Sequence, residues 1–86
     1  MDDAELWLET AYEDLNAAEI MLNNQKYSHA CFLSQQSTEK SIKALHIHLN
    51  GDPWGHSILK LLSELKQLDL EIYENFKDLE DSARIR

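Results

Sequence analysis

Both glycines and the single proline of this 86-residue chain lie close together, at Gly51, Pro53 and Gly55. Because glycine and proline are the residues that most often interrupt helices and strands, this segment predicts the main break in the chain. The remaining sequence offers few positions for tight turns. A fold of many short strands needs frequent turns, so we expect a few long helices instead.

Residues 27–49 predict a long helix in the middle of the chain. They include no Gly or Pro and are rich in helix-forming residues. Apolar residues occur almost all round this helix, so we expect it to be central. At about 100° per residue, small side chains recur along one side, where a second helix can approach closely. These small residues are Ala30, Ser34, Ser37, Ser41 and Ala44.

Three further helices are predicted, each with an apolar stripe at helical spacing. The first covers about residues 3–23, helix three begins after a Ser57 cap, and helix four begins after an Asp69 cap. The stripe of helix four is Ile72, Tyr73, Phe76, Leu79 and Ala83. Four amphipathic helices with short links predict an all-α, antiparallel up-and-down four-helix bundle, formed by a single domain of residues 1–86.

The charge is strongly acidic and unevenly distributed. The formal net charge is −8, and residues 1–25 carry seven acids and no base. Residues 26–68 carry five Lys against three acids, together with all four His. The acidic balance disfavours direct DNA binding, which depends on cations. With no apolar run long enough to span a bilayer, no basic signal peptide and one Cys, the sequence predicts a cytoplasmic protein without membrane contact.

The first two predicted helices each carry a pattern of residues that is found in one protein family. Trp7, Ala11, Asp14, Leu15 and Ala18 fit the pattern W-x3-A-x2-D-L-x2-A. The second helix fits y-x2-A-x-F-x2-Q-Q-x2-E-K-x2-K-A through Tyr27, Ala30, Phe32, Gln35, Gln36, Glu39, Lys40, Lys43 and Ala44. His56-Ser57-Ile58 and Leu61-Leu62 fit H-s-l-x2-L-l, and Ala83-Arg84 resembles an A-r near the end of helix four. On these residues the chain resembles a HEPN domain, the "higher eukaryotes and prokaryotes nucleotide-binding" domain.

This resemblance implies a function as well as a fold. It implies a helical bundle, commonly a homodimer, that partners a minimal nucleotidyltransferase in prokaryotic pairs resembling toxin–antitoxin modules. Nucleotide binding is the activity for which the family is named. Similar members continue into a tyrosine-rich stretch and a fifth helix, so we expect a short or truncated member.

Ribonuclease members of the wider family carry Arg followed four to six residues later by His. The only Arg here are Arg84 and Arg86, and no His follows them. We therefore expect no catalytic residue and no enzyme activity in these residues. A ribonuclease toxin whose Arg-to-His motif lies beyond residue 86 remains an alternative, and a ligand-free homodimerisation or protein-interaction domain is another.

The candidate nucleotide or phosphate site lies on the polar side of residues 27–49. Two ammonium groups, an amide and an imidazole could hold a phosphate there. His56 could add a contact at the start of helix three, where backbone N–H groups point outward. The alternative is a solvated face, with Glu39 and Lys43 paired at i,i+4. The candidate residues are His29, Gln36, Lys40, Lys43 and His56.

Asp14 and Glu39 are interpreted as structural polar residues between helices. Asp14 lies on the edge of the first stripe, where it could pair with Lys40 or Lys43 and fix the register of the two helices. His46 and His48 point about 160° apart on a helix, and no recognised ligand spacing occurs. We therefore expect no metal site and no cofactor.

Overall fold

The computed structural model describes residues 3–48 and 54–84, with side chains described as far as Asp78. Three helices make up the fold: α1 is Asp3–Asn23, α2 is Tyr27–Ile47 and α3 is Gly55–Arg84. No strand occurs among the residues described. The all-α prediction is therefore confirmed, but the predicted four-helix bundle is not, because the described residues form three helices.

The error lies in α3, which runs through the predicted boundary between helices three and four. Its 30 residues contain no Gly after Gly55 and no Pro, so nothing interrupts the backbone. Its buried positions recur at spacings of three and four without a change of phase. They are Ile58, Leu61, Leu65, Leu68 and Ile72.

Asp69 is therefore an interior residue of α3 and not a cap. Its carboxylate accepts a hydrogen bond from Ser34 Oγ at 3.1 Å, which ties α3 to α2. Two residues expected on the inner face of helix four are exposed instead: Tyr73 by 64% and Phe76 by 41%. The side chains of Leu79 and Ala83 lie outside the described part. The Ser57 cap is also wrong, because α3 begins two residues earlier, at Gly55.

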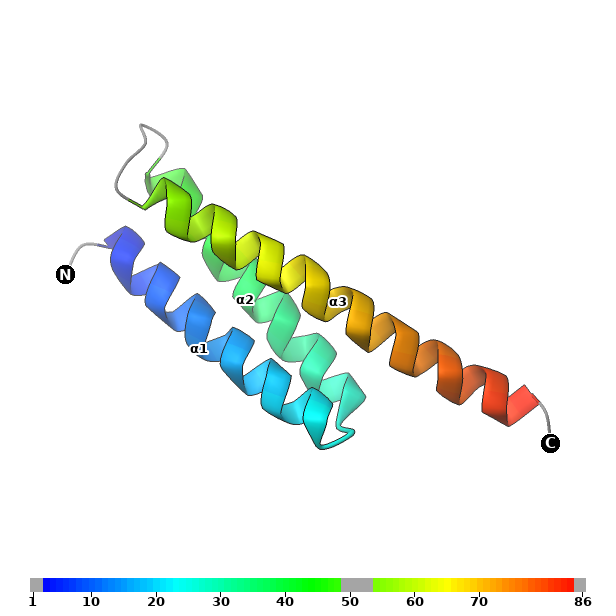
Figure 1. Cartoon of the computed structure of the whole chain (residues 1–86). Helices are drawn as coiled ribbons and strands as arrows, with labels where there is room; N and C mark the ends of the chain where they lie inside the picture. Colours follow the sequence, from blue (N-terminus) through cyan, green and yellow to red (C-terminus); the bar gives the residue numbers. More distant parts are fainter. Residues whose placement is uncertain (1–2, 49–53, 85–86) are drawn as a thin grey trace.

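The helix α2 lies between the other two, as Figure 1 shows. It packs along α1 and, on another side, against α3, whereas α1 and α3 share a much smaller contact. At about 1.5 Å per residue, α1 and α2 are each about 31 Å long and α3 is about 45 Å long. The C-terminal part of α3 therefore extends past the turn that joins α1 to α2 (Figure 1). No helix in the described part is long and apolar enough to cross a membrane.

The strip of small residues on α2 is buried, as its spacing predicted. Ser37 is fully buried, and its hydroxyl donates a hydrogen bond of 2.6 Å to the backbone carbonyl of Ala11 on α1. A side-chain-to-backbone bond of this length needs two helices in close contact, which only small side chains allow. The α1 residues at this contact include Ala4, Ala11 and Ala18, all completely buried.

The turn between α1 and α2 is short and polar. The carbonyl of Ile20, near the end of α1, accepts two hydrogen bonds from Asn24, one from its side-chain amide at 2.7 Å and one from its backbone N–H at 3.1 Å. Gln25 adopts the left-handed conformation, with a φ of 61°. These two residues turn the chain so that α2 returns along α1.

Candidate functional site

The structure brings together only part of the predicted phosphate site. Gln36, Lys40 and Lys43 lie within two turns on the side of α2 that adjoins α1. His29 is 14 residues from Lys43 along α2, or about 21 Å at the helical rise. His29 is exposed beside Ser28 and Phe32, around a shallow hollow at the start of α2. One phosphate cannot contact both His29 and Lys43.

His56 lies still farther from His29. It is the second residue of α3 and is exposed there. Near His29, at the start of α2, the ring of Tyr27 packs edge-on against that of Phe76 on α3, with centroids 5.7 Å apart. Phe76 follows His56 by 20 residues, about 30 Å along the helix. The two histidines therefore belong to opposite ends of the molecule.

Both lysines of the candidate site are engaged by α1. The ammonium of Lys40 lies 2.7 Å from a carboxylate oxygen of Asp14, in an ion pair that is partly screened from solvent. The ammonium of Lys43 lies over the Trp7 ring, 4.5 Å from its centroid, which is a cation–π contact. An incoming phosphate would have to compete with the Asp14 carboxylate for Lys40. This arrangement stabilises the register of α1 against α2.

Glu39 lies one residue before Lys40, so its side chain points about 100° away. It is exposed, and the carboxylate that pairs with Lys40 across the α1–α2 contact is that of Asp14 on α1 and not that of Glu39. The two acids assigned to a structural polar pair therefore do different things. Asp14 joins two helices, and Glu39 faces solvent.

The energetic coupling between Asp14 and Lys40 is a first prediction. Because both side chains are partly exposed, we expect a coupling free energy of about 0.5–1 kcal/mol in a double-mutant cycle of Asp14→Ala and Lys40→Ala. The measurement is urea unfolding of the four proteins. A matched cycle with Asp14→Ala and Lys43→Ala should give a smaller value. If Lys40→Ala lowered the free energy of unfolding equally in wild type and in Asp14→Ala, the ion pair would contribute nothing to stability.

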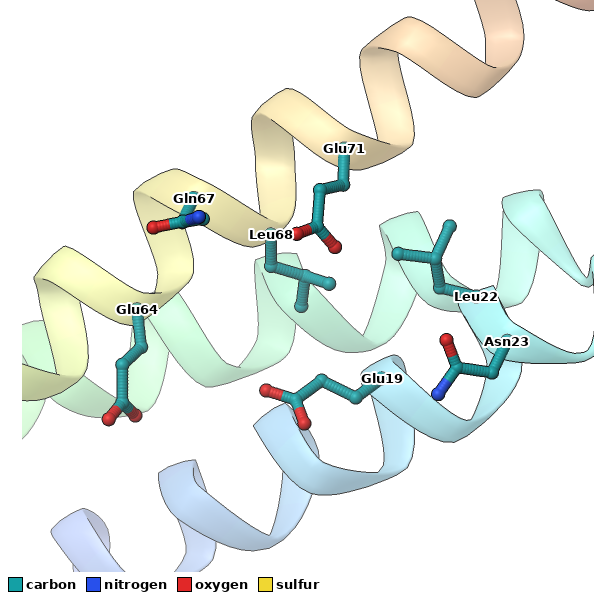
Figure 2. Close-up of a pocket in the computed structure, with 7 residues that line it drawn as sticks. All are labelled: Glu19, Leu22, Asn23, Glu64, Gln67, Leu68 and Glu71. Carbon is teal, nitrogen blue, oxygen red and sulfur yellow. The ribbon is translucent and has the colours of Figure 1, made fainter.

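A groove between α1 and α3 was not anticipated from the sequence. Its volume is about 400 Å³, and Leu22 and the buried Leu68 line it together with polar side chains. Figure 2 shows the Glu19 carboxylate reaching from α1 and those of Glu64 and Glu71 from α3. These acids are distant in sequence, so only the packing of α1 beside α3 brings them together. Within the described residues, no group of three His, Cys, Asp or Glu side chains could hold a metal ion.

Tyr12 connects α1 to the start of α3. Its hydroxyl donates a hydrogen bond of 3.2 Å to the backbone carbonyl of Ser57. Burial, and secondarily the negative charge of Glu64, raises the pKa of the Tyr12 phenol above its ordinary value. Both effects have the same direction because each disfavours the phenolate.

The raised pKa of Tyr12 predicts a loss of stability in alkali. Because the folded-state pKa exceeds the unfolded value, the folded state holds this proton more tightly. The resulting stabilisation is fully present below about pH 10 and is lost as the pH rises through the folded pKa. Tyr12→Phe removes both the hydrogen bond and the titration. In urea unfolding at pH 8, we expect the free energy of unfolding of wild type to be about 1 kcal/mol higher than that of Tyr12→Phe. Above about pH 10 this difference should be smaller. A difference independent of pH would contradict this prediction.

Comparison with known proteins identifies the fold family. A family model described as HEPN domain matches residues 4–86, nearly the whole chain. The chain belongs to the HEPN family. No curated protein and no solved structure gives a significant match. The match extends over all of α2 and α3 and over α1 from its second residue onward, so all three helices of this HEPN chain contribute to it.

Proposed function

We propose that this HEPN chain is a protein-interaction module without catalytic activity, whose partners are a second copy of itself and a minimal nucleotidyltransferase. The observation that carries the proposal is an exposed apolar surface on the side of α2 and α3 away from α1. We call it the α2–α3 face. Its exposed residues are Ile42, Leu45, Leu59, Leu70 and Tyr73, and it also includes Leu62, which is partly buried against the core.

The α2–α3 face differs from a scatter of single exposed hydrophobic residues. It borders a groove of about 360 Å³ between α2 and α3, lined by Thr38, Leu62, Leu65, Lys66, Asp69 and Leu70. Leu59 is 67% exposed and Leu70 is 54% exposed, although each belongs to a well-formed helix. Contiguous apolar surface of this kind is typical of sites that bind another protein.

The nucleotidyltransferase enters the proposal through family membership, and binding can be measured directly. The test is isothermal titration calorimetry of the chain with a purified minimal nucleotidyltransferase from the same genome, at two temperatures. We expect saturable binding with a negative heat-capacity change, because apolar surface is buried. Ile42→Asp should weaken binding, whereas Ile20→Asp, at a similarly exposed site on α1, should not. Absence of binding at about 100 μM would reject this partnership.

Nucleotide binding is the second candidate function. One observation favours it: Lys43 and Gln36 share a side of α2 with Lys40, and Lys43 remains exposed. The test is to add ATP, AMP and GTP to isotopically labelled protein and follow the amide shifts by NMR. Saturable shifts around Lys40 and Lys43 that disappear in a Lys40→Ala, Lys43→Ala variant would support this function. If no amide shifts at millimolar ligand, nucleotide binding is rejected and the protein-interaction function is the one that remains.

A further inference from the structure

The side of the molecule on which α1 and α3 meet is open, because these two helices share a much smaller contact than either has with α2. The groove of about 400 Å³ lies on this side, and one wall comes from each helix (Figure 2). We call it the α1–α3 groove. Two neighbouring helices that leave a groove between them offer a packing surface to a further helix.

Two leucines give the α1–α3 groove an apolar part. Leu68 on α3 is almost fully buried, whereas Leu22 on α1 is only partly buried. Figure 2 shows their side chains pointing into the space between the two helices. The exposed part of Leu22 is therefore available for contact with an apolar side chain of another molecule, which would remove that surface from water.

Three carboxylates line the same groove without a base to compensate them. Glu19 comes from α1, and Glu64 and Glu71 come from α3. None of the three forms an ion pair with another described residue, since the ion pair found in the described part joins α1 to α2. Residues 1–25 contain no Lys or Arg, so α1 supplies no cation. Like charges on facing walls repel each other, and a cationic occupant would relieve this repulsion.

The spacing of the carboxylates fits a helix better than a single ion. No group of three such side chains in the described part could hold one metal ion. Glu64 and Glu71 are seven residues apart, which is two turns or about 10.5 Å along α3. Two bases seven residues apart on a second helix have the same separation. A third base on its other flank can then reach Glu19, and an apolar residue between the flanks can contact Leu22.

The charge of the whole chain favours the same kind of partner. A net charge of −8 attracts a cationic protein and accelerates its association. A second copy of this chain would bring further acids to the groove and would be repelled. The occupant that fits both the local and the overall charge is therefore a different, basic molecule.

We propose that the α1–α3 groove is a docking site for a basic amphipathic helix of a partner protein, whose Lys or Arg side chains pair with Glu19, Glu64 and Glu71. Around α3, the direction of the two glutamates is about 150° from that of the α2–α3 face. The two surfaces are therefore separate. This inference goes beyond the proposed function, and neither depends on the other.

The test is an NMR titration of the isotopically labelled 86-residue chain with a synthetic peptide. The probe is an alanine-based helical peptide of about 18 residues, with Arg at positions i, i+7 and i+8 and Leu at i+4. At about 100° per residue, this Leu lies between two Arg on one flank and one Arg on the other. We expect saturable amide shifts along both walls of the groove, at Glu19, Leu22, Glu64, Gln67 and Glu71.

A second peptide isolates the amphipathic pattern. It has the same composition and the same Arg positions, but its Leu is moved to i+2, on the opposite side of the helix. The apolar contact with Leu22 is then lost while all three charges remain. We expect this peptide to bind about tenfold more weakly.

Two variants of the chain isolate the three carboxylates. Combining Glu19→Gln, Glu64→Gln and Glu71→Gln removes three ion pairs, so we expect the dissociation constant to rise about tenfold. The matched control changes the net charge equally at exposed positions outside the groove and should bind almost as wild type does. It carries Glu9→Gln, Glu13→Gln and Glu39→Gln. Circular dichroism establishes that both variants are folded.

Three results would overturn the inference. Equal weakening in both triple variants would show that only the net charge attracts the peptide. Equal binding of the two peptides, or the same shifts with spermidine at the same concentration, would make the groove a general cation site. Absence of shifts along the groove at about millimolar peptide would reject docking there. The calorimetric titration with Ile42→Asp tests the proposed function separately, on the α2–α3 face.

Discussion

Replacing Ser37 with leucine is expected to lower the free energy of unfolding by about 3 kcal/mol. Ser37 is completely buried, and its hydroxyl lies 2.6 Å from the Ala11 carbonyl of α1. A leucine adds three carbon atoms where the backbone of α1 already lies. Because α1 and α2 form the most extensive helix contact in the molecule, forcing them apart disturbs the whole core. Urea unfolding followed by circular dichroism measures the loss.

Two matched variants isolate the steric cause. Ser37→Ala removes only the hydrogen bond and should cost about 1 kcal/mol. Ser28→Leu makes the same substitution at an exposed position of α2 and should change the stability little. If Ser37→Leu lowered the free energy of unfolding no more than Ser37→Ala, this result would contradict the close approach of α1 to α2 at Ser37.

Replacing Gln67 with proline is expected to cost at least about 3 kcal/mol. Gln67 is exposed and lies in the middle of the single helix α3. Proline there removes a backbone hydrogen bond and clashes with the preceding turn. The two ends of α3 would then no longer present their buried leucines along one line. Urea unfolding is again the measurement.

This variant distinguishes a continuous α3 from two shorter helices. If the chain broke between Leu65 and Asp69, Gln67 would lie in a link, where proline is tolerated. Gln67→Ala keeps the helix and removes the same side chain, so it should be close to wild type in stability. Near-equal stability of the proline and alanine variants would contradict the continuous helix.

The close packing of α1 and α2 could be predicted from the sequence because both sides of the contact are small residues at helical spacing. A row of Ala and Ser on α2 has few other physical explanations. By contrast, the sequence did not predict that α3 is one continuous helix. Asp69 has the chemistry of a helix cap, and only the tertiary structure shows that its carboxylate instead accepts a hydrogen bond from Ser34.

In the candidate site, too, some contacts between residues distant in sequence could not be predicted. Asp14 was expected near Lys40 or Lys43 because all three lie at the α1–α2 boundary, and the structure places it on Lys40. The contact of Lys43 with Trp7 joins residues 36 apart and has no local signal. The acidic groove likewise depends on how α1 lies beside α3, which periodicity does not specify. A phosphate-binding role for His29, Gln36, Lys40, Lys43 and His56 stays a prediction.

The most direct test of the account is the dependence of backbone amide chemical shifts on the concentration of the labelled chain itself. If this HEPN chain associates with a second copy of itself through the α2–α3 face, the amides of Leu59, Leu62, Leu70 and Tyr73 should shift with increasing concentration. The amides of Lys40 and Lys43 should stay constant. Shifts confined to the Lys40 and Lys43 side, or no shifts along α3, would contradict it.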